Sequence, residues 1–150
     1  MKKTAAEVLR EARSVFPNCK LLRQIETSRW SDIASLLLSP QGREAALHKG
    51  WPTSEVLRKI PKSVARDNGL YFNAGAQEFA DPKNDLIFVG DTQAEVTLSA
   101  PTRLYRFLVM QGASLTLIVK NYAVATLACD KDSFYIINDK DGTPSVNVER

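Results

Sequence analysis

The chain has 150 residues, of which 44% are hydrophobic and 25% charged, with a formal net charge of +3; this is typical of a soluble globular protein of one domain. No apolar run approaches the roughly 20 residues of a membrane-spanning helix, and the basic start Met1-Lys2-Lys3 leads into polar residues, without the apolar core of a signal peptide. Cys19 and Cys129 lie far apart and predict no disulfide framework. We therefore expect an intracellular, cytoplasmic protein.

The first part of the chain carries helix signals. Thr4-Ala5-Ala6-Glu7 has the form of a capping box and is followed by apolar residues at helical spacing, which predicts a helix to about residue 16. Pro17-Asn18 ends this helix, and residues 20–27 are weakly patterned, typical of a short strand or an extended connection. A second helix is predicted to start near Ser28 or Ser31 and to run through Leu38.

Three shorter helices are expected before residue 70. Ser39-Pro40 reads as an N-cap followed by proline at the first helical position, and Gly50 supplies a left-handed stop. Thr53 caps a fourth helix, and residues 63–68 form a last turn that Gly69 closes.

From Leu70 to Ile137, β-branched and aromatic residues dominate, and both apolar residues and turns recur at a spacing of about nineteen. Each unit holds two strand segments and two turns. The aligned apolar residues form two four-residue columns and two shorter ones: Leu70, Val89, Leu108 and Leu127; Phe79, Leu98, Leu117 and Ile136; Val96, Leu115 and Phe134; Leu86, Tyr105 and Val124.

Two architectures fit this period. In a β-solenoid each unit is one rung of a parallel coil, whereas in an antiparallel meander the same strands pair as hairpins and close into a sandwich or barrel. The matching residue types of the columns, the recurrence of the turns in phase and the lack of two-residue Asn-Gly hairpin turns between most strands favour the solenoid. We predict an α+β protein with a helical N-terminal cap, residues 1–69, on a small β-solenoid of about four rungs, residues 70–150, in one folding unit.

The strands at the two ends of a solenoid have unpaired backbone N–H and C=O groups, which can form hydrogen bonds with a strand of another chain. The helical part is expected to cap one end by packing its Leu and Trp residues over the first rung, with Trp30 and Trp51 locking the two parts together. Nothing in the sequence caps the other end, and residues 142–148 break the nineteen-residue step, so they do not form a full further rung. We expect this end, with Val146 and Val148, to pair with a second copy of the chain in a homodimer.

Charge is distributed unevenly along the chain. Residues 1–69 contain 13 Lys/Arg and 7 Asp/Glu, a net charge of +6, whereas residues 70–150 contain 7 Lys/Arg and 10 Asp/Glu, a net charge of −3. A basic face can bind nucleic acid or an acidic partner, although a solvated surface is the simpler interpretation. The candidate residues for such a face are Arg10, Arg13, Lys20, Arg23 and Arg29.

Catalytic and cofactor motifs are missing. The phosphate-binding patterns G-x-G-x-x-G and G-x-x-x-x-G-K-[ST] and the nucleophile elbow G-x-S-x-G do not occur. His48 is the only histidine and fits a helix C-terminus. The carboxylates of Asp130, Asp132, Asp139 and Asp141 could hold a hard cation but are interspersed with lysines, which favours solvated turn residues. We expect no enzyme, no catalytic residues, no cofactor and no metal.

Three segments carry a resemblance: Leu-Ser-Pro-Gln-Gly-Arg-Glu at 38–44, Gly-Trp-Pro at 50–52, and Asn-Gly-Leu-Tyr-Phe-Asn-Ala-Gly at 68–75. Together they resemble small uncharacterised bacterial proteins of the kind found on phage-like or other mobile elements, a group that implies no function and no site residues. The β repeats resemble short β-helix scaffolds such as the bactofilins, from which the helical part departs; this departure argues against a polymerising role.

These observations lead to ranked hypotheses. The first is a non-enzymatic structural or protein-interaction protein that self-associates through the β-solenoid. The alternative is a module that binds nucleic acid or an acidic partner through the basic helical half. A third is a protein that binds or acts on carbohydrate with a flat face of the solenoid.

Overall fold

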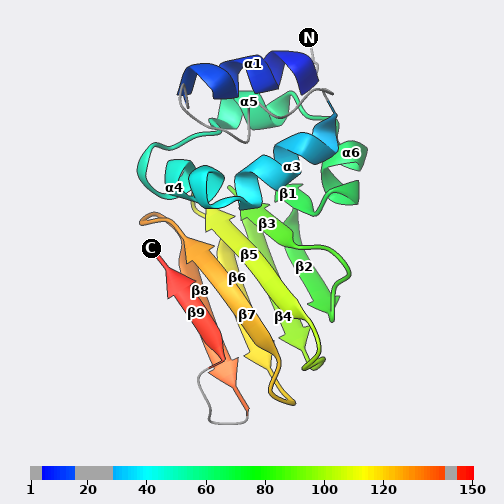
Figure 1. Cartoon of the computed structure of the whole chain (residues 1–150). Coiled ribbons are helices and arrows are strands. Elements are labelled where there is room, and N and C mark those ends of the chain that lie inside the picture. Colours follow the sequence, from blue (N-terminus) through cyan, green and yellow to red (C-terminus); the bar gives the residue numbers. More distant parts are fainter. Residues whose placement is uncertain (1–4, 16–28, 141–144) are drawn as a thin grey trace.

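The computed structural model describes residues 5–15, 29–140 and 145–150, which form helices followed by parallel strands (Figure 1). The helices are α1 (Ala5–Val15), α3 (Trp30–Leu38), α4 (Pro40–His48), α5 (Ser54–Arg58) and α6 (Lys62–Asp67). The strands are β1 (Leu70–Phe72), β2 (Gly75–Ala80), β3 (Leu86–Val89), β4 (Thr92–Leu98), β5 (Leu104–Met110), β6 (Ser114–Val119), β7 (Val124–Cys129), β8 (Phe134–Asp139) and β9 (Val146–Glu149). None of the described helices is long and apolar enough to cross a bilayer.

Local signals set the helix boundaries as the sequence predicts. The Ser39 side chain accepts a hydrogen bond from Gly42 N at the start of α4, and Thr53 accepts one from Val56 N at the start of α5. Gly50 and Gly69 have φ angles of 66° and 79°, so the chain turns in the left-handed region after α4 and after α6. The predictions for Thr4, for Pro17-Asn18 and for residues 20–27 lie outside the described residues.

The strands form a β-solenoid of about four turns. One sheet has the order β1-β3-β5-β7-β9 and the other β2-β4-β6-β8, and every neighbouring pair is parallel. We call them sheet A and sheet B. Each turn contributes one strand to each sheet, so the solenoid prediction is confirmed and the antiparallel meander is wrong. Leu98 and Leu117 lie in neighbouring parallel strands, and β9 adds half a turn.

The turns differ in length, which a single period of nineteen conceals. Paired residues are 17 apart between the first and second turns (Leu70 and Ile87), 21 apart between the second and third (Val96 and Leu117), and 20 apart between the third and fourth (Phe107 and Leu127). Because side chains alternate between faces, steps of 17 or 21 residues keep the face that a step of 19 predicts, whereas a step of 20 reverses it.

The predicted columns are therefore wrong in register, and in the fourth turn also wrong in face. Leu98 pairs with Val119 rather than Leu117. Leu108 contacts the helices, whereas Leu127 lies inside the solenoid. The remaining fourth-turn residues that the columns place in the interior are exposed: Val124 at 45%, Phe134 at 70% and Ile136 at 65%.

The helices pack along one side of the solenoid, over the ends of the sheet A strands, rather than over the first rung alone (Figure 1). Contacts run from α6 on β1 to α4 on β7. The covered part of sheet A is its carboxyl-terminal half, since in β5 Leu104 is 52% exposed whereas Leu108 and Met110 are fully buried. The expectation of an end cap over the first rung is thus corrected to a cover along the coil.

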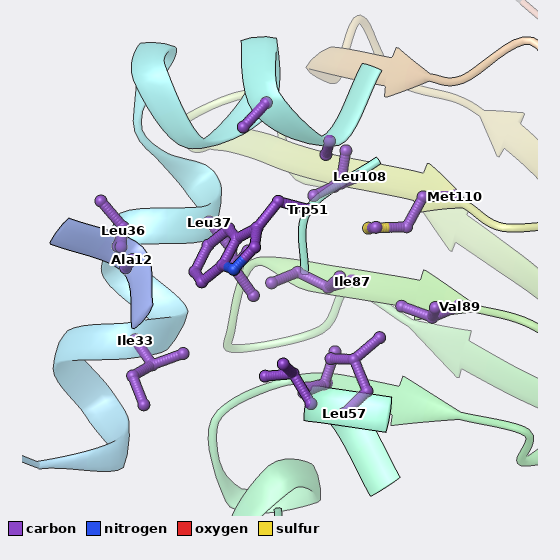
Figure 2. Packing of buried hydrophobic residues seen from close by; sticks show 14 of the residues in the cluster. Ala12, Ile33, Leu36, Leu37, Trp51, Leu57, Ile87, Val89, Leu108 and Met110 are labelled. Atoms are coloured by element: carbon purple, nitrogen blue, oxygen red, sulfur yellow. The ribbon is translucent and has the colours of Figure 1, made fainter. Parts of the chain in front are cut away.

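Two hydrophobic cores result. One lies between sheets A and B and holds the inward side chains of both. The other lies between the helices and the outer face of sheet A, where Trp51, 5% exposed, sits among Leu37, Ile87 and Leu108 (Figure 2). Trp30 is only partly buried against this core. The packing is consistent with the prediction that the tryptophans join the two parts of the chain.

Candidate interaction surface

The carboxyl-terminal end of the solenoid leaves one strand at the edge of each sheet. β9 ends sheet A and β8 ends sheet B, and within the described residues each has a strand neighbour on one side only. Tyr135 and Ile137 of β8 and Val146 and Val148 of β9 pack against the interior core and are half-buried. Their partial exposure follows from their position, since no described strand covers them.

Sheet B becomes more apolar toward the same end. Across its outer face, one row runs Glu78, Glu95, Thr116 and Ile136, from acidic to aliphatic. The neighbouring row ends at Phe134, beside Ser114. Large exposed apolar side chains that adjoin one another often mark an interaction site in a soluble protein. We call the six residues of both strands the end patch: Phe134, Tyr135, Ile136, Ile137, Val146 and Val148.

The end patch is held in place by residues that follow it. Arg150 donates to the carbonyl oxygens of Asp130 and Ser133, at 3.2 and 3.3 Å, and its guanidinium lies 5.5 Å from the centre of the Tyr135 ring. Glu149 lies 3.5 Å from Nε of Arg43 in α4, which ties β9 to the helices. The patch is therefore presented by anchored strands, which lowers the entropy lost on binding.

The basic residues suggested by the sequence do not form one described surface. Arg10 and Arg13 are exposed on α1, whereas Val8, Leu9 and Ala12 of the same helix are buried. Arg29 precedes α3 and forms an ion pair with Asp32, with 4.0 Å between Nε and Oδ2. The other two candidates, Lys20 and Arg23, lie outside the described residues.

The carboxylates considered as cation ligands take part in turns. Asp130 is buried and accepts hydrogen bonds from the backbone N–H of Gln111, 2.8 Å away in the preceding turn of the coil, and of Asp132 at 3.2 Å. Asp139 accepts one from Ser145 Oγ. Asp141 lies outside the described residues, and no group of three or more His, Cys, Asp or Glu side chains in the described ranges could hold a metal ion.

Two further side chains with possible chemistry are accounted for by their surroundings. His48 is exposed in the last turn of α4. Cys129 is buried inside the solenoid, and burial raises the pKa of its thiol, which keeps the sulfur in its less reactive protonated form.

Sequence reasoning proposed Val146 and Val148 for this end but missed Phe134 and Ile136, which it placed in the interior. The run Phe134-Tyr135-Ile136-Ile137 is apolar without alternation, so the sequence carries no signal for which pair points outward. The 20-residue step decides it, and this step is set by the turn between β6 and β7, because β5 and β7 already pair at 20 residues.

Comparison with protein-family models, with curated proteins and with solved structures gave no match.

Proposed function

We propose that this protein is a non-enzymatic structural or interaction protein that self-associates through the carboxyl-terminal end of its solenoid. The observation that carries the proposal is the end patch, in which large apolar side chains surround two strand edges that lack a neighbour among the described residues. Exposed edges with apolar side chains pair readily with other strands. A second copy of the same chain offers edges of the same composition.

The offset between the two sheets favours one arrangement of the copies. Sheet A has one strand more than sheet B, so β9 projects half a turn beyond β8. A twofold axis that places β9 of each copy beside β8 of the other fills both offsets and continues both sheets. Pairing β9 with β9 instead leaves a gap one strand wide between the two β8 strands. Closed twofold interfaces of this self-complementary kind are the commonest in soluble oligomers.

Strand direction agrees with this arrangement. The strands of sheet A run toward the helices, and those of sheet B run away from them (Figure 1). The twofold axis that exchanges the two sheets runs parallel to the strands, so the rotation leaves the direction of every strand unchanged. Because β9 runs toward the helices and β8 runs away from them, β9 lies antiparallel to the partner's β8. Val146 and Val148 then lie on the same inner side as Tyr135 and Ile137 of the partner subunit and close the open core.

The energetics allow a stable dimer. Full burial of a Val, Leu, Ile or Phe side chain contributes about 1.5–3 kcal/mol, and the open core supplies four half-buried side chains in each copy, from Tyr135, Ile137, Val146 and Val148. Association costs an estimated 4–15 kcal/mol in lost translational and rotational freedom. The patch can therefore offset this cost.

Light scattering coupled to size-exclusion chromatography tests the proposal. We expect the mass of two copies at micromolar concentration, and a monomer for the double variant Val146→Lys/Val148→Lys, because the added charges would lie in the core that the two copies close. The control is Ala76→Lys/Ala80→Lys, which adds the same charge to exposed positions of β2 at the other end of sheet B. A monomeric wild type, or equal loss of the dimer in the control, would refute self-association through this end.

Cross-linking tests the strand pairing. In chains with Cys19 replaced by serine, a short bismaleimide should link Asn147→Cys to Asn138→Cys only when the two variants are mixed, because these exposed positions meet on one face in the pairing of β9 with β8. Pairing of β9 with β9 would instead cross-link the Asn147→Cys variant with itself.

Binding of nucleic acid or an acidic partner remains the second proposal, supported by the exposure of Arg10 and Arg13 on α1. Salt-sensitive retention on heparin that is lost in Arg10→Gln/Arg13→Gln would support it. Retention equal to that of the wild type would count against a role for these residues.

A further inference from the structure

A second surface feature lies at the opposite end of the solenoid, where β1 is the edge strand of sheet A and α5 and α6 pack beside it. A pocket of about 260 Å³ opens between these elements. Its wall is mostly apolar, and its apolar side chains come from both parts of the chain: Leu57, Ile60, Ala65, Leu70 and Phe72.

Cationic side chains surround this pocket. Arg58, Lys62 and Arg66 line it and are exposed, and no Asp or Glu is among its lining residues. In the part of the chain that the structure describes, none of the three forms an ion pair. An apolar wall with unpaired cations at its rim complements a ligand that has an apolar body and a negative head.

The volume limits the size of this ligand. Binding sites for drug-sized molecules usually measure about 300–1,000 Å³. At about 260 Å³ this pocket is slightly smaller, which suits a small molecule rather than a folded partner.

We propose that this pocket binds a small amphiphilic anion, with a carboxylate or similar head beside Arg58, Lys62 and Arg66 and an aliphatic or aromatic body against Leu57, Leu70 and Phe72. The site is independent of the end patch, which lies at the other end of the coil. Guanidinium and ammonium groups bind carboxylates through charge-assisted hydrogen bonds. The exposed head makes this part of the affinity sensitive to salt.

Octanoate and 1-octanol form a matched pair of probes, since they share the alkyl chain and differ in charge. In an amide NMR titration of the intact chain, we expect octanoate to shift the resonances of residues 57–74 and to bind in the millimolar range or tighter. We expect 1-octanol to bind about tenfold more weakly, because it lacks the charge that the three cations recognise.

Substitutions test separately the binding of the charged head by the three cations and the binding of the apolar body by the pocket wall. Arg58→Gln/Lys62→Gln/Arg66→Gln should weaken octanoate about tenfold while leaving 1-octanol unchanged. The control Arg10→Gln/Lys120→Gln/Lys131→Gln removes the same charge at exposed positions away from the pocket and should change octanoate affinity less than twofold. Ala65→Leu should weaken both probes by filling the pocket, with an amide spectrum that otherwise matches the wild type.

Three results would overturn the proposal: no octanoate-dependent shifts at residues 57–74, equal affinity for the two probes, or equal loss of octanoate binding in the two triple variants. A melting curve for each variant shows whether a loss of binding reflects unfolding.

Discussion

The two sheets of the solenoid are built from the same turns of chain but bury their faces differently. In sheet A, all four residues of β3 are buried, because the helices cover the outer face and sheet B covers the inner one. In sheet B, β4 alternates between buried and outward-facing residues. Sheet A thus holds the two parts of the protein together, whereas sheet B has an outer face free to carry an interface, and only its last strand shows large exposed apolar side chains there.

The largest effect should come from a charge in the interior that both sheets share. Leu117 of β6 is fully buried between the sheets, so Leu117→Asp places an unpaired carboxylate there and should destabilise the protein by more than about 4 kcal/mol. Urea unfolding monitored by circular dichroism measures this. The control Ser114→Asp adds the same charge on the outer face of the same strand and should cost less than about 0.5 kcal/mol. Equal stability of both variants would show that the Leu117 side chain is not in the interior.

The next effect concerns only the covered face of sheet A. Trp51→Ala removes a buried ring from between the helices and the sheet and should cost about 3–5 kcal/mol in unfolding free energy. Trp30→Ala is the matched control, because this ring is partly exposed and its loss should cost about 1 kcal/mol. If the two substitutions cost the same, Trp51 would not be the main link between helices and solenoid. Trp51→Phe, a smaller change, gives an intermediate value if Trp51→Ala does not fold.

The contrast between the sheets also explains what the sequence could and could not predict. Turn residues and β-branched segments recur twice in each unit, so the repeat and its two strands per unit follow from the pattern, whereas the pattern favours parallel pairing without excluding an antiparallel meander. The register does not follow from the pattern, because turns of different length move the steps to 17, 21 and 20 residues. A single residue of slip in the fourth turn is enough to turn Phe134 and Ile136 outward.

The position of the helices had a signal in the sequence. Residues 86–89 and 107–110 are apolar without alternation, which is typical of strands buried on both faces, whereas residues 92–98 alternate. This difference predicts that something covers the sheet made of the first kind of strand. The pocket beside β1 had no comparable signal, because Arg58, Lys62 and Arg66 resemble any solvated helix surface until α6 is placed against β1.

A smaller effect tests the solvent-facing side of sheet B. Glu78 and Glu95 are exposed and directly opposite each other on β2 and β4, and like charges in such pairs are destabilising. Glu95→Lys converts this pair into an attractive one and should stabilise the protein by about 0.2–1 kcal/mol at low salt. The double variant Glu78→Lys/Glu95→Lys restores two like charges and should cancel the gain. A gain that survives in the double variant would assign the effect to something other than this pair.

The smallest effect concerns a carboxylate that links the two sheets. Asp81 follows β2 of sheet B and accepts hydrogen bonds from the Ser99 backbone N–H at 2.6 Å, from the Ser99 hydroxyl, and from the hydroxyl of Tyr105 in sheet A at 3.1 Å. These bonds, with those from Ser99 the strongest, lower the pKa of Asp81 below its ordinary value, although burial opposes them. They favour the charged form, so the contribution to stability is present above the unfolded-state pKa of about 3.9 and is lost as the pH falls through the lower folded-state pKa.

We therefore expect the melting temperature of the wild type to fall slightly more than that of Asp81→Asn between pH 5 and pH 2. Asparagine keeps one acceptor and tolerates the φ of 43° at this position, so the two proteins should melt similarly at pH 2, where the carboxyl is protonated, and the wild type should melt slightly higher at pH 5, where its bonds are exposed to solvent and therefore weak. Parallel pH profiles would show that Asp81 contributes no charge-dependent link between the sheets. The steeper profile of the wild type would show that the turns, and not only the shared interior, hold sheet A and sheet B together.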